Sequence, residues 1–361
     1  MKKNSTLFVL LLFVLNMTGQ RKYSNEFLNI GVDAAALGQS KSVTATSSDV
    51  NSIYWNPAGL ASVTVSQGAL MHTSYFAGIA NYDYAAVAIA PKNTDGVVLA
   101  FSFIRFGVDD IMNTTELIDN NGNIDYNRIS LFSAADYALN FGLGKKINSI
   151  PGMNIGMNAK VIRRKIGEFA SSWGIGFDAG LQYKVKKWQL GLMLRDITTT
   201  YNTWTIDSES FESIQNAIPG QNQELPETTE ITLPKIHLGI AKSFDLKNRD
   251  FHLLSALDFH MRFAQTNDII STSSFSMDPS IGFQLDYQNI VFLRVGAGNF
   301  QNIEQFDDSS SLSLQPNLGL GFSYHGIQID YALSNIASTG NALYSNTFSI
   351  KIDFDFMKTT K

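Results

Sequence analysis

The feature that most limits the fold of this chain is a set of long segments in which apolar and polar residues alternate strictly. In "WGIGFDAGLQYK", residues 173–184, Trp173, Phe177 and Tyr183 fall on one face of a strand, and the other face carries glycine and polar residues. The same arrangement returns in residues 188–195, 281–287, 317–324 and 348–356. A half-buried strand of a soluble sandwich also alternates, so one segment alone decides nothing.

The number and the length of these segments are more informative. Most are roughly 10–14 residues long, whereas strands of soluble proteins average about 5 or 6 residues and a tilted strand needs about 9–11 residues to cross a bilayer. About fourteen segments can be placed, an even number that suits a single-chain outer-membrane barrel. They lie near residues 67–76, 80–90, 96–106, 131–144, 153–166, 173–184, 188–197, 235–244, 250–263, 275–287, 290–299, 313–325, 327–335 and 346–356.

The connections between the segments give an independent test. Every second connection is short: Pro91–Asp95, Lys145–Gly152, Val185–Lys187, Asp245–Arg249, Gln288–Asn289 and Gly326. The others include long polar stretches: Gly107–Ser130, Ile197–Pro234, Ala264–Ser274, Phe300–Leu312 and Ile336–Ser345. Two of this second set, near Ala77–Ile79 and Gly167–Ser172, are short and fit less cleanly. Short turns on one side and long loops on the other predict an all-β fold, a transmembrane antiparallel β-barrel of about 14 strands in the outer membrane.

Composition agrees with an exported membrane protein and excludes several function classes. Of 361 residues, 44% are hydrophobic and 16% are charged, and a soluble domain usually has about 25% charged residues. A net charge of −5 argues against a nucleic-acid binder, because phosphate affinity needs clustered cations. The chain has no cysteine, which excludes disulfides and thiolate chemistry.

The N-terminus has the order of a secretory signal. Lys2 and Lys3 precede the apolar run Leu7–Leu15, which is followed by small and polar residues. We therefore predict that residues 1–20 are a signal peptide; the alternative is a short apolar helix that is retained. Residues 65–361 are then expected to form the barrel.

Residues 21–64 are too few for a domain and too apolar for a free tail. A barrel of about 14 strands is too wide to be filled by its own side chains, since about eight strands is the size that packs solid. We predict that this segment folds inside the barrel as a plug, with a rigid corner at Trp55, Pro57 and Gly59. The alternative is a surface turn that leads into the first strand.

Inward-facing positions supply the candidates for chemistry. The simplest interpretation is a mixed-sign lumen whose charges pair with one another and with water. The charged residues predicted to face inward are Asp136, Lys160, Arg164, Asp178, Arg195, Asp258, Arg262, Asp286, Arg294, Asp330, Lys351, Asp353 and Asp355.

No enzyme or cofactor site emerges from these positions. His237, His252 and His260 share the inward face, and a diagonal His237–His260 pair at roughly 7–8 Å suits a metal only loosely. The carboxylate pairs Asp109–Asp110 and Asp307–Asp308 fall in predicted loops, where solvation or weak cation binding explains them. We predict no catalytic residue, cofactor or metal.

One motif links the plug to known proteins. Gly31, Ala34 and the run Ala36–Gly38 precede Asp49 and the motif Tyr54, Trp55, Asn56, Pro57, Ala58, Gly59, Leu60. Together they resemble the N-terminal signature shared by FadL-type barrels and the PorV/PorQ family of outer-membrane proteins. Gln39 and Ser40 follow Gly38 where many relatives have more glycine, so the detailed plug conformation is left open.

Chain length and composition resemble the PorV/PorQ group more than the longer fatty-acid transporters. That resemblance implies a type IX secretion component, a monomeric barrel in outer-membrane lipid that docks translocon subunits or cargo with C-terminal signal domains. The long loops Gly107–Ser130 and Ile197–Pro234 are the expected docking surfaces. The alternative is a FadL-like passive transporter of hydrophobic small molecules, which the charged inward faces Asp258–Arg262 and Lys351–Asp355 fit less well.

Overall fold

The computed structural model describes residues 24–75, 78–90, 96–115, 117–118, 122–208, 228–246, 250–304, 309–334 and 344–354. The predicted signal peptide, Asp307–Asp308 and Asp355 lie outside these described residues. No helix in the described part is long and apolar enough to cross a membrane.

Short helices form the N-terminal segment and strands form the rest. The helices are η2 (Glu26–Asn29), α2 (Ala34–Gly38), α3 (Ser52–Trp55), η3 (Pro57–Ser62) and η5 (Tyr126–Arg128). The strands are β1 (Gln67–Tyr75), β2 (Ala80–Ile89), β3 (Val97–Asn113), β4 (Ser130–Lys146), β5 (Met153–Ile166), β6 (Ala170–Val185), β7 (Trp188–Arg195), β8 (Thr200–Ile206), β9 (Thr229–Thr232), β10 (Lys235–Asp245), β11 (Phe251–Arg262), β12 (Ile270–Ser271), β13 (Ser276–Tyr287), β14 (Val291–Glu304), β15 (Ser310–Tyr324), β16 (Ile327–Ser334) and β17 (Ser345–Asp353).

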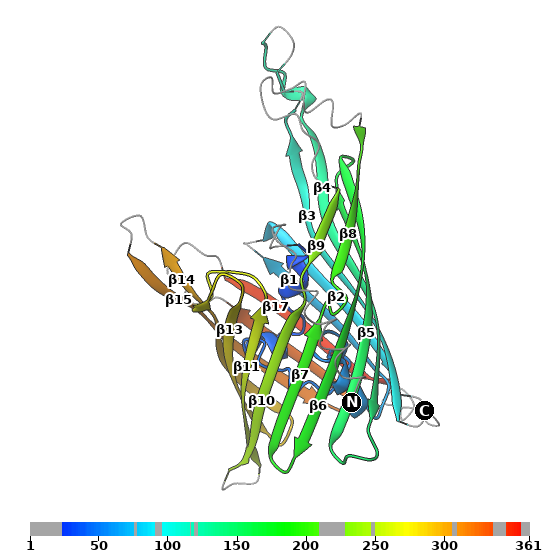
Figure 1. Cartoon of the computed structure of the whole chain (residues 1–361), viewed down its shortest axis with the longest axis vertical. Coiled ribbons are helices and arrows are strands. Elements are labelled where there is room, and N and C mark those ends of the chain that lie inside the picture. The colour runs from blue at the N-terminus through cyan, green and yellow to red at the C-terminus, as the bar shows by residue number, and fades with distance from the viewer. Residues whose placement is uncertain are drawn as a thin grey trace, which may run out of the picture.

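The strands close into one antiparallel barrel (Figure 1). β1 pairs with both β2 and β17, so the sheet has no free edge. β7 and β8 both pair with β6, so they share one position in the wall. β10 pairs with β7 and β9 with β8, so β9 and β10 share the next position. The two-residue β12 pairs with β13 and adds no position. The 17 strands therefore occupy fourteen positions, which confirms the predicted fourteen-stranded barrel.

Three of the predicted periplasmic turns are tight, those at Val185–Lys187, Gln288–Asn289 and Gly326, whereas Pro91–Asp95 and residues 247–249 lie outside the described part of the chain. Lys186, Gln288 and Asn289 adopt positive φ, and the β15–β16 turn does so at His325 and Gly326. Positive φ at the turn residues gives the backbone twist that closes two-residue hairpins.

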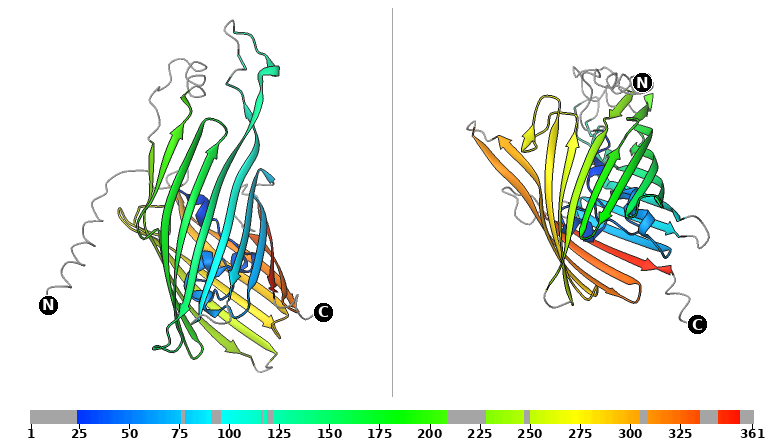
Figure 2. Two further views of the ribbon diagram at one scale, coloured as in Figure 1. Left: turned by 90° about the vertical axis from the view of Figure 1, so that its right-hand side faces the viewer. Right: turned by 60° about the horizontal axis from the view of Figure 1, so that its bottom comes forward.

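Several of the predicted loops are partly wrong. β14 and β15 extend into Phe300–Leu312 from both sides. β3 continues to Asn113 through a bulge after Val108 and pairs there with the start of β4, so the first part of Gly107–Ser130 is strand. Similarly, Ile197–Pro234 contains β8 and β9. These hairpins rise above the rest of the barrel (Figures 1 and 2), where both faces of a strand meet water and alternation disappears.

The outer face of the wall is apolar and exposed. Leu139, Phe177 and Leu318 point outward at mid-strand. Trp173 and Tyr324 are also exposed, and they belong to the predicted aromatic girdles at the membrane surfaces. In lipid, every backbone group must be bonded within the protein, which a closed sheet achieves. The closed sheet and its apolar belt place the chain in the outer membrane, as predicted.

A charge in this belt should be costly. We expect Phe177→Arg to destabilise the barrel by about 2–4 kcal/mol, because Phe177 faces lipid near the bilayer centre. This destabilisation is detected as the loss of heat-resistant migration of the folded barrel in electrophoresis. Normal migration of the variant would show that this face does not contact lipid.

The N-terminal segment lies inside the barrel, which confirms the predicted plug. Figure 2 shows its short helices enclosed by the strands. Phe27, Val32, Ile53 and Leu60 of this segment are buried in one apolar cluster with inward residues of the wall, including Tyr82. The predicted surface turn is therefore wrong.

Candidate functional site: the plug and its seat

The aromatic corner ties the two ends of the plug together. The Tyr54 hydroxyl donates to the carbonyl of Leu28 at 2.6 Å, and the Trp55 indole N–H donates to the carbonyl of Val32 at 3.1 Å. The two rings meet edge to face, with centroids 4.8 Å apart. The corner thus fixes the path of residues 24–33 across the end of α3.

The Asn-Pro-Ala-Gly turn attaches the corner to the wall. The Asn56 carboxamide oxygen caps η3 by accepting from the Ala58 N–H, with Pro57 at the first helical position. The Asn56 amide donates to the carbonyls of Thr44 and, in the wall, of Leu181 at 3.3 Å and Leu192 at 3.4 Å. A Cβ on Gly59 would lie 2.1 Å from the carbonyl oxygen of Ser47, so only glycine fits there.

All seven residues of the motif are buried inside the lumen. The set comprises Tyr54, Trp55, Asn56, Pro57, Ala58, Gly59 and Leu60. They support the plug and bind the wall, and none of them faces the aqueous surface.

Inward glycines of the wall form the surface on which the plug backbone rests. A Cβ on Gly156 of β5 would lie 2.2 Å from the carbonyl carbon of Pro57, and one on Gly191 of β7 would lie 2.4 Å from the carbonyl oxygen of Thr44. Gly282 of β13 meets Gln39 in the same way. We call the inward glycines that contact the plug the glycine seat: Gly142, Gly144, Gly156, Gly180, Gly191, Gly239, Gly282, Gly296 and Gly319.

Charged inward residues fasten the plug from the other strands. Lys351 pairs with Asp49 at 2.6 Å, and the Asp258 carboxylate accepts from the N–H of Thr44 at 2.8 Å. The predicted mixed-sign lumen is therefore only partly correct. Arg164 with Asp136 and Arg294 with Asp330 do pair within the wall, but other inward charges bind the plug.

Arg195 makes the most extensive of these attachments. Its guanidinium donates to the carbonyls of Leu28 at 3.1 Å and Tyr54 at 2.7 Å, and it stacks on the Tyr54 ring at 4.5 Å. One buried side chain thus holds both parts of the plug that the aromatic corner joins.

The inward face of β1 to β3 is mainly apolar instead. Tyr82, Tyr84, Ile104 and Ile162 are buried against the apolar side of the plug. We call the contact of these four residues with the plug the apolar seam. The lumen therefore combines charge and glycine contacts with an apolar seam, and polar contacts with the plug also reach β1 and β5, at Gln67 and Asn158.

The wall is interrupted beside the plug where β7 gives way to β8. Asp196 and Thr199 adopt positive φ there, and on the neighbouring position β9 and β10 are separated at Pro234, which has no N–H for the ladder. Pairing resumes with Ile175 opposite Tyr201. Strand pairing with β6 continues on both sides of the interruption, through β7 and through β8, so the interruption is a bulge and not a gap in the wall.

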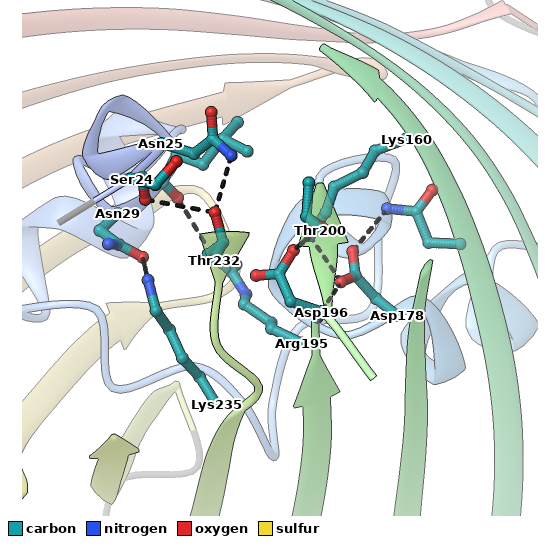
Figure 3. Close-up of polar contacts among 12 residues, drawn as sticks. Ser24, Asn25, Asn29, Lys160, Asp178, Arg195, Asp196, Thr200, Thr232 and Lys235 are labelled. Atoms are coloured by element: carbon teal, nitrogen blue, oxygen red, sulfur yellow. Dashed lines mark hydrogen bonds and ion pairs between the residues drawn. The ribbon is translucent and has the colours of Figure 1, made fainter. Parts of the chain in front are cut away.

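Lys160 sits at the inner side of this bulge. Its ammonium group lies 2.7 Å from a carboxylate oxygen of Asp178 and 2.7 Å from one of Asp196, and all three side chains are at most 7% exposed (Figure 3). Asp178 also accepts from the N–H of Asp196 at 2.8 Å, and Thr200 donates to Asp196. This buried network fixes the shape of the bulge.

Replacing Lys160 should destabilise the wall. In Lys160→Met two buried carboxylates lose their cation, and removing one partner of a buried ion pair costs about 3–5 kcal/mol. Urea unfolding in detergent micelles measures this cost, with Lys165→Met, at an exposed position of the same strand, as the control. Equal unfolding midpoints for the two variants would contradict the role of the network.

The start of the described chain is tied to the same part of the wall. Asn25 donates to the Thr232 hydroxyl at 2.8 Å and accepts from Asn202 at 2.7 Å, and Lys235 donates to Asn29 at 3.0 Å (Figure 3). The first residues of the plug therefore rest on β8, β9 and β10 beside the bulge.

The histidines differ from the prediction. His237 and His260 are directly opposite each other, not diagonal, and their rings meet edge to face at 4.4 Å. His252 instead contacts Asp286 at 3.2 Å. The described residues contain no group of three His, Cys, Asp or Glu side chains that could hold a metal ion.

Sequence reasoning missed the glycine seat and the role of Arg195. A signal for the seat was present, because glycines recur at inward positions of most predicted strands. Glycine weakens a strand unless another backbone approaches closely. The partners of Arg195 are backbone carbonyls, which leave no trace in side-chain identity.

Comparison with known proteins supports the fold. No protein-family model and no curated protein matches the sequence. Among solved structures, the CymD monoaromatic hydrocarbon channel has a TM-score of 0.55 and 12% identity, and the match covers 90% of this chain and 98% of that one. A FadL homologue of Pseudomonas aeruginosa has a TM-score of 0.51 and 12% identity, over 90% of this chain and 98% of that one. The fold is that of the FadL-like outer-membrane barrels, and the narrower resemblance to the PorV/PorQ family finds no support.

Proposed function

We propose that this protein is a passive outer-membrane channel for small hydrophobic molecules, which pass along the apolar seam when the plug moves away from it. The observation that carries the proposal is the seam itself. Tyr82, Tyr84, Ile104 and Ile162 offer an apolar inner wall, and the plug is held on that side by contacts that a hydrophobic molecule can replace without leaving a charge unpaired.

The inward charges do not oppose this function. Lys351 and Asp258 seemed to favour a polar lumen, but both are engaged with the plug, at Asp49 and at the Thr44 N–H. They hold the plug in place, and Lys351 does so from β17, directly beside the apolar seam. The similar folds of a monoaromatic hydrocarbon channel and a FadL homologue support the same choice.

The bulge between β7 and β8 gives this channel a candidate side exit. Ladder pairing is locally replaced there by the network of Lys160, Asp178 and Asp196. Separation of this network and of one backbone hydrogen bond, from the Ile197 N–H to the Phe177 carbonyl, would open the wall next to the plug without breaking a continuous strand pair.

Uptake of a hydrophobic probe tests the proposal. Deleting the gene should lower the accumulation of radiolabelled toluene severalfold, and the intact gene should restore it, while uptake of a hydrophilic disaccharide stays unchanged. Toluene accumulation that is unaffected by the deletion would contradict the proposal. If surface display of secreted proteins fell instead, the type IX secretion role implied by the sequence resemblance would replace it.

A further inference from the structure

Three charged or titratable side chains face outward from the membrane wall of β1, β2 and β3. His72, Asp83 and Arg105 stand opposite one another in register across these strands. His72 Nδ1 lies 2.7 Å from Asp83, and the Arg105 guanidinium lies 3.7 Å from Asp83 and 3.1 Å from Asp109. The His72 side chain is 57% exposed and that of Asp83 41%, so these groups point away from the plug.

The depth of this row can be estimated from the strands. Asp83 and Arg105 are each six residues from Ile89 and Leu99, the pair at the periplasmic end of β2 and β3. At about 3.3 Å per residue that is about 20 Å along the strand, or about 14 Å of depth at a tilt of about 45°. The apolar band of such barrels is about 25 Å tall, so the row lies within it, three residues below the outer end of β2 at Ala80.

This depth is apolar on the other walls of the described barrel. Outward side chains at comparable positions are Leu139, Phe177, Leu238, Val295 and Leu318. Charged groups that face acyl chains are costly. The row is therefore hard to reconcile with a wall covered by lipid alone.

A hollow lies directly below the row. It has a volume of about 410 Å³ and is lined by Leu70, Ala85, Phe103 and Phe348, with His72 and Asp83 at its upper edge. Leu70 and Ala85 are cross-strand partners. Leu70 is 59% exposed, so a projecting side chain stands next to a depression at nearly the same depth.

We propose that a second copy of this chain covers this wall, in a dimer with its two-fold axis along the membrane normal between β1 and β2. Two copies inserted with the same orientation can be related only by such an axis, so each residue meets partners at its own depth. The axis brings each Leu70 against the other copy's Ala85 hollow, and it places the two charged rows at the same depth on either side of that contact. Because the row carries both signs of charge, it is complementary to itself.

This inference departs from the monomeric barrel expected from the sequence, and it goes beyond the proposed channel function. The dimer and the channel function are tested independently, because toluene uptake does not report the number of copies of the chain. A chain without cysteine also allows single cysteines to report contacts without a background.

Cross-linking in native membranes tests the dimer. Ala85→Cys should yield a band at twice the monomer mass with a membrane-permeable oxidant or a short bis-maleimide. Leu257→Cys, which also faces outward but on β11 across the barrel, should not. Equal yields for the two variants, or no cross-link for Ala85→Cys, would overturn the proposal.

Counting copies gives a second test that requires no cross-link. The unmodified protein, extracted with its lipids into polymer-bounded nanodiscs, should show two copies per disc by native mass spectrometry. Ala85→Trp, which fills the hollow, should show one copy while keeping heat-resistant migration. One copy per disc in the unmodified protein would overturn the proposal, whether the wall is then covered by lipid or by a different protein.

Discussion

Gly156→Val is expected to unseat the plug and to convert a closed barrel into a conducting pore. The added side chain would begin 2.2 Å from the carbonyl carbon of Pro57 and 2.4 Å from the nitrogen of Ala58. The obstacle is backbone on both sides, which cannot rotate away as a flexible side chain would. Because the wall is held by continuous pairing with β4 and β6, we expect the plug to move instead.

Single-channel conductance in planar bilayers measures this effect. We expect a severalfold rise for Gly156→Val and no rise for Ala159→Val, which places a valine on the outward face of the same strand. Gly59→Ala should behave like Gly156→Val, because its Cβ would meet the Ser47 carbonyl. A Gly156→Val barrel that folds and conducts no more than the parent would show that the seat does not hold the plug closed.

Arg195→Met is expected to release the first part of the plug while the corner stays in place. The variant leaves the Tyr54 carbonyl without its donor and the Leu28 carbonyl with only the Tyr54 hydroxyl, and a buried acceptor left unsatisfied costs about 1–3 kcal/mol. The release in Arg195→Lys should be intermediate between those in the parent protein and in Arg195→Met, because an ammonium group lacks the planar fork that reaches both carbonyls.

Hydrogen–deuterium exchange of the detergent-solubilised protein reads this release directly. Amides of residues 24–33 should exchange faster in Arg195→Met, while those of β4 and β5 keep their protection. Leu194→Met, on the lipid-facing side of the same strand, is the control. Unchanged exchange in residues 24–33 would mean that other contacts hold this part of the plug.

Most of the barrel could be predicted from the sequence because lipid imposes a simple rule. Where one face of a strand meets acyl chains, apolar residues must alternate, and β5 begins and ends at its predicted residues. The rule lapses above the membrane. The sequence therefore predicts loops at the outer part of β3 and at the short β8 and β9, which are strands in the structure.

The plug was predictable in existence but not in detail. The width of the barrel and the apolar character of residues 21–64 required something inside. Its attachment depends on backbone partners, such as Pro57 against Gly156 and Leu28 with Arg195, and no pattern in the sequence identifies a backbone contact. The outward row at His72, Asp83 and Arg105 was missed because its strands still alternate in hydrophobicity.

The most direct test of the central claim, that hydrophobic molecules pass only when the plug moves, is to lock the plug to the wall. The hydroxyls of Ser42 in the plug and Ser280 in β13 are 3.0 Å apart and buried, so Ser42→Cys with Ser280→Cys should form a disulfide in a chain that has no other cysteine. Toluene accumulation by cells that carry the oxidised double variant should fall to the level of the deletion strain and be restored by reduction, with each single variant unaffected. Uptake that stays at the parental rate in fully oxidised protein would contradict the account.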